Sequence, residues 1–254
     1  MLNGKKGVIL GIANKRSIAW AVAQSAARAG AELVLTYQNE RHEPTVRALA
    51  DTLPGSPVLL PCDVDDEQQV KAFAEQAHEH AGKIDFLVHS LAFADPAELK
   101  KEFHRTSREG FRTALETSVH SFIALSNAVE PFLSDHGSLV TLSYIGAVRV
   151  IPNYKLMGVA KAALEATVRY LAYDLGARGI RANAVSAGPI RTVSATSIGD
   201  FHRILNHVEE MSPLRRNVEA AEVADVVTFL LSDYARAITG SVLYADGGYH
   251  TMGL

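Results

Sequence analysis

Tyr154 and Lys161 are a potential proton donor and a cation, with six residues between them. At about 100° per residue on a helix, seven steps make two turns less roughly 20°, so both side chains would share one face. A phenol with a pKa of about 10 stays protonated at neutral pH and can donate to a developing oxyanion, which an ammonium also stabilises. The pair therefore indicates proton-donor chemistry, although a core-edge ring and a solvated lysine often share this spacing.

A helix is expected to begin just before this tyrosine. Pro152 and Asn153 form a helix-start signal, with Asn153 in the capping position, and the helix is predicted over 154–177. About one turn before Lys161 stands Met157, whose thioether has no proton to give. A donor at Tyr154, facing a cleft, lies about one turn, roughly 5 Å, farther along the axis than a donor at position 157 would.

The whole composition limits the possible classes of protein. The chain has 254 residues, 48% of them hydrophobic, which suffices for a full α/β core in one domain. Its single cysteine, Cys62, excludes an internal disulfide and a cysteine-based zinc cage, and fits a reducing cytosol. The ten histidines show no HExxH or comparable spacing, so no metal is expected.

The absence of targeting signals and the low net charge also limit the possible classes of protein. No apolar run approaches the roughly 20 residues of a membrane span, and the N-terminus enters a strand pattern without a signal-peptide profile. A soluble, cytoplasmic protein without membrane contact is therefore expected. The net charge of -3 argues against a nucleic-acid surface, which normally has a basic excess.

Short β-branched and aliphatic runs alternate with longer helical patterns along the chain. Strands are predicted at 7–10, 33–36, 58–60, 86–88, 139–142, 181–185 and 242–244. This alternation predicts a single-domain, Rossmann-like, doubly wound parallel sheet of seven strands over 1–254, with helices on both faces. Ligands of such sheets bind at the carboxyl ends of the strands. Residues 190–217, called the flap below, are the least regular stretch and are expected to cover the substrate.

The loop after the first strand is suited to a dinucleotide. Gly11 allows a tight turn, Ser17 can cap the following helix, and the free amides of that helix start can hold a pyrophosphate. Small Ala19 and Ala23 let the helix pack closely on the strand. The stretch 11–19 is not a regular GxGxxG, and a simple strand-turn-helix would also explain it.

The ends of the second and third strands bear on the choice of cofactor. Many NAD enzymes place an acid at the end of the second strand, and NADP enzymes an arginine, but this chain has the neutral Gln38. Gln38 can bind adenosine without requiring a phosphate, which favours NADH, while Arg41 keeps NADPH as the alternative. Asp63 and Val64 can contact an adenine, or Asp63 can belong to the turn that starts the next helix.

Taken in order, these segments resemble the short-chain dehydrogenase/reductase superfamily, and within it the enoyl-acyl carrier protein reductases of bacterial fatty-acid synthesis. The resemblance covers essentially the whole chain. It is carried by residues 11–19, Thr36-Tyr37-Gln38, His89-Ser90-Leu91-Ala92-Phe93-Ala94, Ser143-Tyr144-Ile145-Gly146-Ala147, Pro152-Asn153-Tyr154, Met157-Gly158, Lys161, Gly188-Pro189-Ile190-Arg191-Thr192 and Asp246-Gly247-Gly248.

The chain departs from the alcohol dehydrogenases of the same superfamily. His89-Ser90-Leu91-Ala92 stands where those enzymes carry an Asn-Asn-Ala-Gly turn, and Met157 stands where their tyrosine would be. The helix around Ser118 also lacks their asparagine. A ketone or alcohol dehydrogenase is thereby disfavoured, and remains an alternative beside a dinucleotide sensor without turnover.

The resemblance implies a role for each matching residue. Tyr154 would be the proton-donating or oxyanion-binding phenol, Lys161 would bind the nicotinamide ribose, and Tyr144 would be a second active-site tyrosine or a buried aromatic. Contacts to the dinucleotide would come from Gly11, Ser17, Ile18, Gln38, Asp63, Val64, Leu91, Lys161, Ile190, Arg191, Thr192, Val193 and Ser194. Contacts to the substrate would come from Ala94, Tyr144, Tyr154, Met157 and Phe201, although Phe201 also suits the core of the flap.

The function expected is NADH-dependent reduction of a trans-2-enoyl thioester. Its hydride goes to the β-carbon while negative charge gathers on the thioester oxygen, three bonds away. In carbonyl reduction the hydride instead lands on the carbon bonded to that oxygen, so the more distant phenol of Tyr154 suits the conjugate reaction.

Two kinds of partner are expected. Arginines of the flap suit an acidic acyl carrier protein that presents the substrate, although such charges usually form a solvated face. They are Arg191, Arg203, Arg215 and Arg216, set against Asp200, Glu209 and Glu210. The resemblance implies a homotetramer, with the helices predicted at 111–132 and 154–177 as interfaces, although their apolar stripes would also serve a monomer core.

Overall fold

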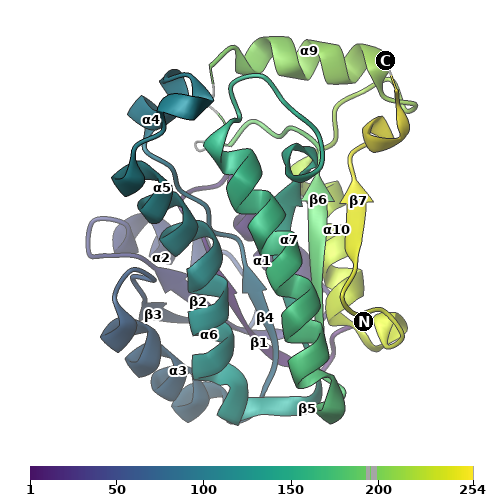
Figure 1. Ribbon diagram of the computed structural model, residues 1–254. Helices are drawn as coiled ribbons and strands as arrows, with labels where there is room; N and C mark the ends of the chain where they lie inside the picture. The colour runs from purple at the N-terminus through teal and green to yellow at the C-terminus, as the bar shows by residue number, and fades with distance from the viewer. Residues whose placement is uncertain (193–194, 196–198, 254) are drawn as a thin grey trace.

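The computed structural model describes residues 1–192, 195 and 199–253 (Figure 1). In this part of the chain, seven strands form one parallel sheet in the order β3-β2-β1-β4-β5-β6-β7, which confirms the predicted fold class. The strands are β1 (Lys6–Leu10), β2 (Glu32–Tyr37), β3 (Val58–Pro61), β4 (Ile84–His89), β5 (Leu133–Tyr144), β6 (Arg181–Ala187) and β7 (Val242–Ala245).

Helices cover both faces of the sheet. One apolar core joins the sheet to α1, α2 and α10, and the other joins it to α3, α6 and α7, the last three lying in front in Figure 1. The helices described are α1 (Ile18–Arg28), α2 (Glu43–Ala50), α3 (Glu67–Ala81), α4 (Pro96–Lys100), α5 (Arg108–Leu115), α6 (Ser121–Val129), α7 (Leu156–Leu175), α9 (Phe201–Met211) and α10 (Ala220–Leu231).

Continuous apolar runs form the central strands because a parallel sheet is buried on both faces. Val8, Ile9 and Leu10 of β1 are fully buried. Ala19 and Ala23 of α1 are fully buried in the same core as Ile9, as their small size predicts. This close packing brings the start of α1 to the carboxyl end of β1.

The helix predicted at 111–132 is interrupted. Five residues, Glu116–His120, form a π-helical turn between α5 and α6. Ser121 Oγ donates to Thr117 O at 2.7 Å, and the His89 ring lies between Ser121 Oγ (2.8 Å) and Thr141 Oγ1 (2.9 Å). Burial lowers the pKa of His89 to about 3, so the neutral ring ties the end of β4 to β5 and to this turn.

The flap is more regular than the sequence predicts. It contains α9, whose residues Leu205 and Val208 are buried, and Asn217 Nδ2 donates to Leu205 O at 3.1 Å. Its apolar residues Phe201, Ile204, Leu205 and Val208 recur at helical spacing, so the sequence carries a periodic signal for this helix that the prediction of an irregular stretch missed. Strand β5 is also longer than predicted. Its first half is polar, so no apolar run marks it in the sequence, and its pairing with β4 contains an irregularity.

Candidate active site

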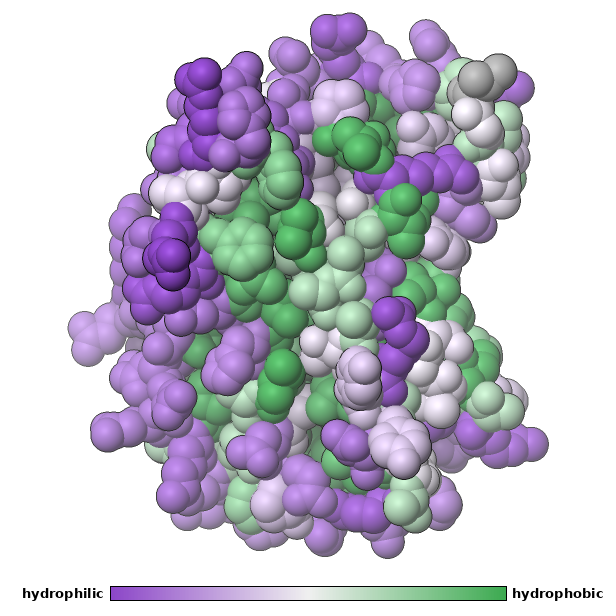
Figure 2. Space-filling view, viewed as in Figure 1, coloured by the Kyte–Doolittle hydropathy of each residue, from purple (hydrophilic) through white to green (hydrophobic). Residues whose placement is uncertain are grey.

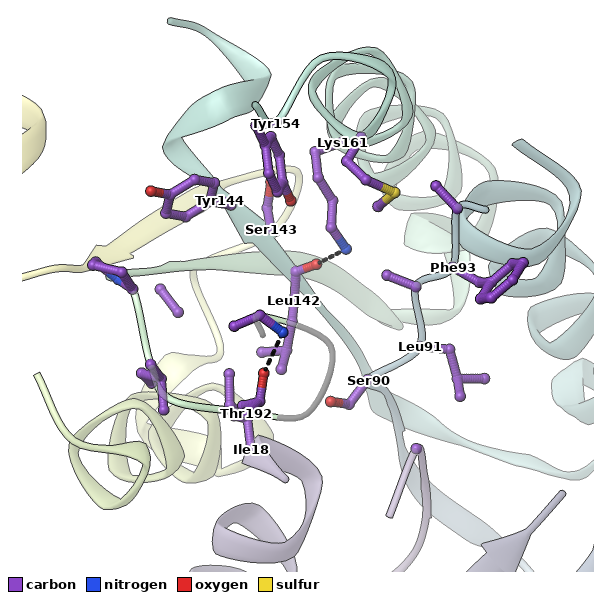
Figure 3. A pocket seen from close by; sticks show the side chains of 18 of the residues that line it. Ile18, Ser90, Leu91, Phe93, Leu142, Ser143, Tyr144, Tyr154, Lys161 and Thr192 are labelled. Atoms are coloured by element: carbon purple, nitrogen blue, oxygen red, sulfur yellow. Dashed lines mark hydrogen bonds between the residues drawn. The ribbon is translucent and has the colours of Figure 1, made fainter. Parts of the chain in front are cut away.

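A cavity of about 430 Å³ opens at the carboxyl ends of the strands (Figure 3). Of the residues predicted to form the site, twelve line it: Gly11, Ser17, Ile18, Leu91, Ala94, Tyr144, Tyr154, Met157, Lys161, Ile190, Thr192 and Phe201. The loops after β1, β4, β5 and β6 and the start of α7 therefore meet at one site, as the doubly wound fold requires.

Two tyrosines and a lysine lie side by side in this cavity (Figure 3). The rings of Tyr144 and Tyr154 meet edge to face, with centroids 4.8 Å apart and an interplanar angle of 65°. Tyr154 is 8% exposed. Burial raises the pKa of both phenols above the ordinary tyrosine value, and each is raised further by nearby acidic groups. Both phenols are therefore protonated hydrogen-bond donors at neutral pH.

Lys161 lies deeper, against the end of β5. It is 6% exposed, and its Nζ donates to Leu142 O at 2.8 Å. Burial lowers the pKa of Lys161 to about 8, and Glu165 opposes that lowering. An ammonium has three N–H donors, so two are available for a ligand in the cavity.

The turn that carries Tyr154 differs from its prediction. Helix α7 begins at Leu156, and Asn153 does not cap it; instead Asn153 Nδ2 donates to Gly199 O at 3.0 Å. Asn153 and Lys155 have positive φ angles of 67° and 41°, outside the extended region that is typical of a capping residue. Lys155 Nζ donates to Lys101 O. Tyr154 therefore lies in a strained turn before the helix, attached to both sides of the cavity.

Glycines permit the close approaches that shape the site. A Cβ on Gly146 would lie 2.4 Å from Tyr154 Cδ1, which explains the glycine of the Ser143-Tyr144-Ile145-Gly146 motif. Gly11 has a φ of 101°, and a Cβ there would lie 2.0 Å from Ser90 O. The loops after β1 and β4 could not pack in this way around a larger residue at position 11.

Ser17 occupies the N-terminal boundary of α1 but does not cap it with its side chain. Ser17 Oγ accepts from Ala13 N at 3.0 Å and from Asn14 N at 3.1 Å, so the predicted cap is wrong. These amides of the preceding loop are closer to the hydroxyl because the loop folds back over the helix start. Within the described part of the chain, Trp20 N donates to Ser17 O at 3.0 Å, and the amides of Ile18 and Ala19 are left to bind an anion.

Four predicted site residues lie outside the cavity lining. Gln38 and Asp63 are neighbours at the ends of β2 and β3, with Gln38 Nε2 3.4 Å from Asp63 Oδ2. Val64 packs partly buried against the core, and Arg191 is exposed. The turn alternative for Asp63 is realised: its Oδ1 accepts from Asp65 N and its O from Asp66 N, each at 3.2 Å, and Asp66 then caps α3. Two further predictions, Val193 and Ser194, fall outside the described residues.

Several lining residues were not predicted. They are Ala13, Pro96, Leu99, Leu142, Ser143, Ala187, Ala195 and Ile204. Ile204 belongs to α9 and Leu99 to α4, and both enter the cavity from elements that cover its mouth. A helical pattern within 201–211 was the available signal for Ile204. Ser143 and Leu142 precede the recognised Tyr144 directly, but only the structure shows which side chain or carbonyl points where.

Two further classes of site are absent from the described residues. No three histidine, cysteine, aspartate or glutamate side chains gather there as a metal-binding set. Nor does any helix in the described ranges have the length and apolar character to cross a membrane.

Known proteins are similar to this chain in sequence and fold. A family profile described as enoyl-(acyl carrier protein) reductase matches residues 11–250. The chain is 49% identical to the enoyl-acyl-carrier-protein reductase (NADH) FabI of Bacillus cereus, covering 100% of this chain and 99% of the relative. It is 47% identical to the FabI of a Nostoc species, with the same coverage.

Solved structures agree with these relatives. The crystal structure of the Bacillus cereus enoyl-acyl carrier protein reductase with NADP+ and indole naphthyridinone superposes with a TM-score of 0.98 at 49% identity, covering 100% of this chain and 99% of the other. The enzyme of Anaplasma phagocytophilum in complex with NAD superposes with a TM-score of 0.96 at 45% identity, covering 100% and 96%.

Proposed function

This chain belongs to the enoyl-(acyl carrier protein) reductase family, and we propose that Tyr154, Tyr144 and Lys161 perform its reaction. It is an oxidoreductase of type II fatty-acid synthesis, which reduces the trans-2 double bond of an enoyl thioester with NADH. The observation that supports the assignment best is the buried pair of protonated phenols beside an ammonium in one cavity.

The residues present fit a dinucleotide. NADH, when bound, supplies the hydride that adds to the β-carbon of the substrate. Gly11, Ser17 and Ile18 would hold its pyrophosphate at the start of α1, where a larger residue at position 11 would clash. Gln38 and Asp63, which face one another, would bind the adenosine.

The rest of the cofactor contacts are assigned to the loops after β3, β4 and β6. We assign Val64 to the adenine, Leu91 to the middle of the cofactor, and residues 190–194 to its nicotinamide end. NADH is preferred because Gln38 is neutral, and the exposed Arg41 is the group through which NADPH would be accepted. A relative whose crystal structure contains NADP+ supports NADPH as the alternative cofactor.

Tyr154 is proposed to act on the thioester oxygen. As the double bond is reduced, negative charge develops on that oxygen, and the phenol donates a hydrogen bond or its proton there. Tyr144, whose ring meets that of Tyr154, positions the thioester from the other side. Lys161 binds ribose hydroxyls with its two remaining donors, and its positive charge favours the developing anion.

The substrate chain is proposed to lie along the apolar side of the cavity. Ala94, Met157 and Phe201 line it there together with Leu99 and Ile204. Met157 is 7% exposed and places a thioether where a carbonyl reductase needs an acid. This disfavours the ketone or alcohol dehydrogenase, while a sensor without turnover would need no buried proton donor.

A single absorbance assay tests the proposed function. The protein is mixed with NADH and either crotonyl-CoA or a ketone, and oxidation of the nicotinamide is followed. We expect oxidation with the enoyl thioester alone. Oxidation with the ketone alone would support the dehydrogenase instead, and no oxidation with either substrate would support the sensor.

An acyl carrier protein is the proposed carrier of the substrate, and Arg203 is the proposed docking residue. Arg203 is exposed on α9, beside the cavity mouth. Arg216, which the sequence suggested equally, instead binds Glu222 through two hydrogen bonds of 2.7 and 2.5 Å. Arg203→Gln should therefore raise KM for carrier-linked substrate and spare the coenzyme A thioester. Arg216→Gln is the matched control, and equal losses with both substrates would contradict the assignment.

A homotetramer is proposed from the surface of the helices. Figure 2 shows apolar side chains gathered on the face over α5, α6 and α7. Phe111 and Ile123 on this face are 44% and 42% exposed, and Tyr170 of α7 is 73% exposed. Apolar patches of this kind usually mark protein contacts. Sedimentation should give four copies, and Ile123→Glu should yield smaller species; a wild-type monomer would contradict the proposal.

We propose that residues 1–254 form a single cytoplasmic reductase domain, with the flap as its substrate cover. Cys62, the one cysteine of the sequence, is buried and free, and burial raises its pKa to about 12. A thiol in this state is unreactive, which suits a reducing compartment.

A further inference from the structure

A buried carboxylate lies beside the proposed catalytic groups. Glu165 is 7% exposed and stands on α7 one turn after Lys161. Its Oε1 accepts a hydrogen bond of 2.5 Å from Ser143 Oγ. Burial of a carboxylate is costly unless partners compensate for the lost water, so its presence next to the site needs a physical reason.

Two consecutive residues of β5 bind two consecutive turns of α7. Leu142 O accepts from Lys161 Nζ at 2.8 Å, and Ser143 Oγ donates to Glu165. Because Tyr144 follows directly, this double attachment fixes the strand end that carries it. A hydroxyl has a single proton, so Ser143 is committed to Glu165 and not to the substrate.

The sheet presents neutral polar groups to the same region. Ser143, Ser186 and Tyr244 are paired directly across β5, β6 and β7, so their side chains point to one side of the sheet. Burial and the charge of Glu165 raise the pKa of Tyr244 above its ordinary value. The Glu165 carboxylate thus lies beneath the site next to a layer of neutral polar side chains from the sheet.

We propose that Glu165 is a positioning residue of the reductase, which keeps the Lys161 side chain positively charged and holds the end of β5 against α7. The inference rests on the proposed function of Lys161. Opposite charges on neighbouring turns of a helix favour the ionised form of each other.

The aromatic groups near Lys161 and Glu165 do not change charge near neutral pH. His89 of β4 is neutral, because burial lowers its pKa to about 3. Tyr144 of β5 and Tyr154 of the turn before α7 are neutral, because burial raises their pKa values. Tyr244 of β7 is neutral for the same reason.

The charged groups around Lys161 determine in which direction its pKa would change if Glu165 were replaced. Burial lowers the pKa of Lys161 to about 8, and the Glu165 carboxylate opposes that lowering. Burial raises the pKa of Glu165, while Ser143, Arg169 and Lys161 favour its ionised form. Arg169, one turn further along α7, donates to Glu165 O at 3.1 Å. Without the carboxylate, Lys161 therefore loses its proton at a lower pH.

The variant Glu165→Gln tests this effect, because it keeps the shape of the side chain and removes its charge. We expect the alkaline limb of kcat/KM, and of NADH affinity measured by fluorescence titration, to move to lower pH by about one unit. Ser143→Ala keeps the charge, so its limb should stay in place while kcat falls roughly 3- to 10-fold. Asp174→Asn makes the same charge change at an exposed position of α7 and is the matched control.

An unmoved limb in Glu165→Gln, or an equal shift in Asp174→Asn, would overturn the proposal. If thermal unfolding shows that Glu165→Gln does not fold, Glu165→Asp replaces it: this variant retains the charge, so its limb must coincide with that of the wild type, and a shift would overturn the proposal. NADH titration needs no turnover. A wild type that reduces no enoyl thioester would therefore refute the proposed function while the titration still decides the role of Glu165.

Discussion

The floor and the rim of the cavity are built in opposite ways. On the floor, Tyr154 and Lys161 are at most 8% exposed, and α7 is attached to β5 by hydrogen bonds from consecutive turns. On the rim, Phe93 is 48% exposed, Phe201 is partly exposed and Arg203 is exposed. The groups proposed for chemistry are therefore positioned by folding itself, whereas the groups proposed for recognition remain available to the substrate.

Loss of the floor phenol should have the largest effect. Tyr154→Phe retains the ring that packs against Tyr144 and removes the proton donor. We expect kcat to fall roughly 100- to 1,000-fold, because a donor aimed at developing charge is lost, with the Kd for NADH nearly unchanged. Steady-state kinetics and fluorescence titration measure the two quantities. Full activity in this variant would refute the role of Tyr154.

Loss of the floor cation should weaken cofactor binding. Lys161→Met keeps an apolar stem of similar length and removes the ammonium that donates to Leu142 O. Because hydrogen bonds from charged groups contribute about 1.5 to 3 kcal/mol, the Kd for NADH should rise roughly 10- to 100-fold. Fluorescence titration measures it, and an unchanged Kd would show that the lysine does not contact the cofactor.

The second tyrosine should have an intermediate effect. Tyr144→Phe removes one neutral hydrogen bond to the substrate, which contributes about 0.5 to 1.5 kcal/mol. We expect kcat/KM to fall roughly 3- to 10-fold while NADH affinity stays the same. Unchanged kcat/KM would support the alternative in which Tyr144 is a buried aromatic without substrate contact.

A rim substitution should give the smallest effect and a different kinetic signature. Phe201→Leu reduces the apolar area at the cavity mouth. We expect KM for a long-chain enoyl thioester to rise roughly 3-fold, since a few buried carbons are lost, with kcat and the crotonyl KM unchanged. A fall in kcat instead would show that the rim takes part in positioning the reacting atoms.

The contrast between floor and rim also explains what the sequence could predict. Strand order and the meeting of loops at one edge follow from alternating patterns, and the motif residues Tyr144, Tyr154 and Lys161 are found together as expected. These positions are dictated by backbone topology and by glycines such as Gly146, which signal close packing.

Side-chain contacts between residues that lie far apart in the sequence could not be predicted. Asn153 reads as a cap from its neighbours in sequence, but a hydrogen bond to Gly199, 46 residues away, draws it elsewhere. The ion pair of Arg216 with Glu222 makes this arginine a poor candidate for docking. The role proposed for Glu165 rests on its hydrogen bond with Ser143 of another element. Helix α9 is a different case, because its apolar residues recur at helical spacing and could have been recognised from the sequence.

The central claim is that the phenol of Tyr154 serves a reaction whose hydride and negative charge are three bonds apart. It is tested most directly with NADH that carries deuterium at the transferable position, followed by NMR of the acyl product. The account predicts deuterium on the β-carbon of a saturated thioester. Deuterium on the former carbonyl carbon, with the double bond intact, would contradict it.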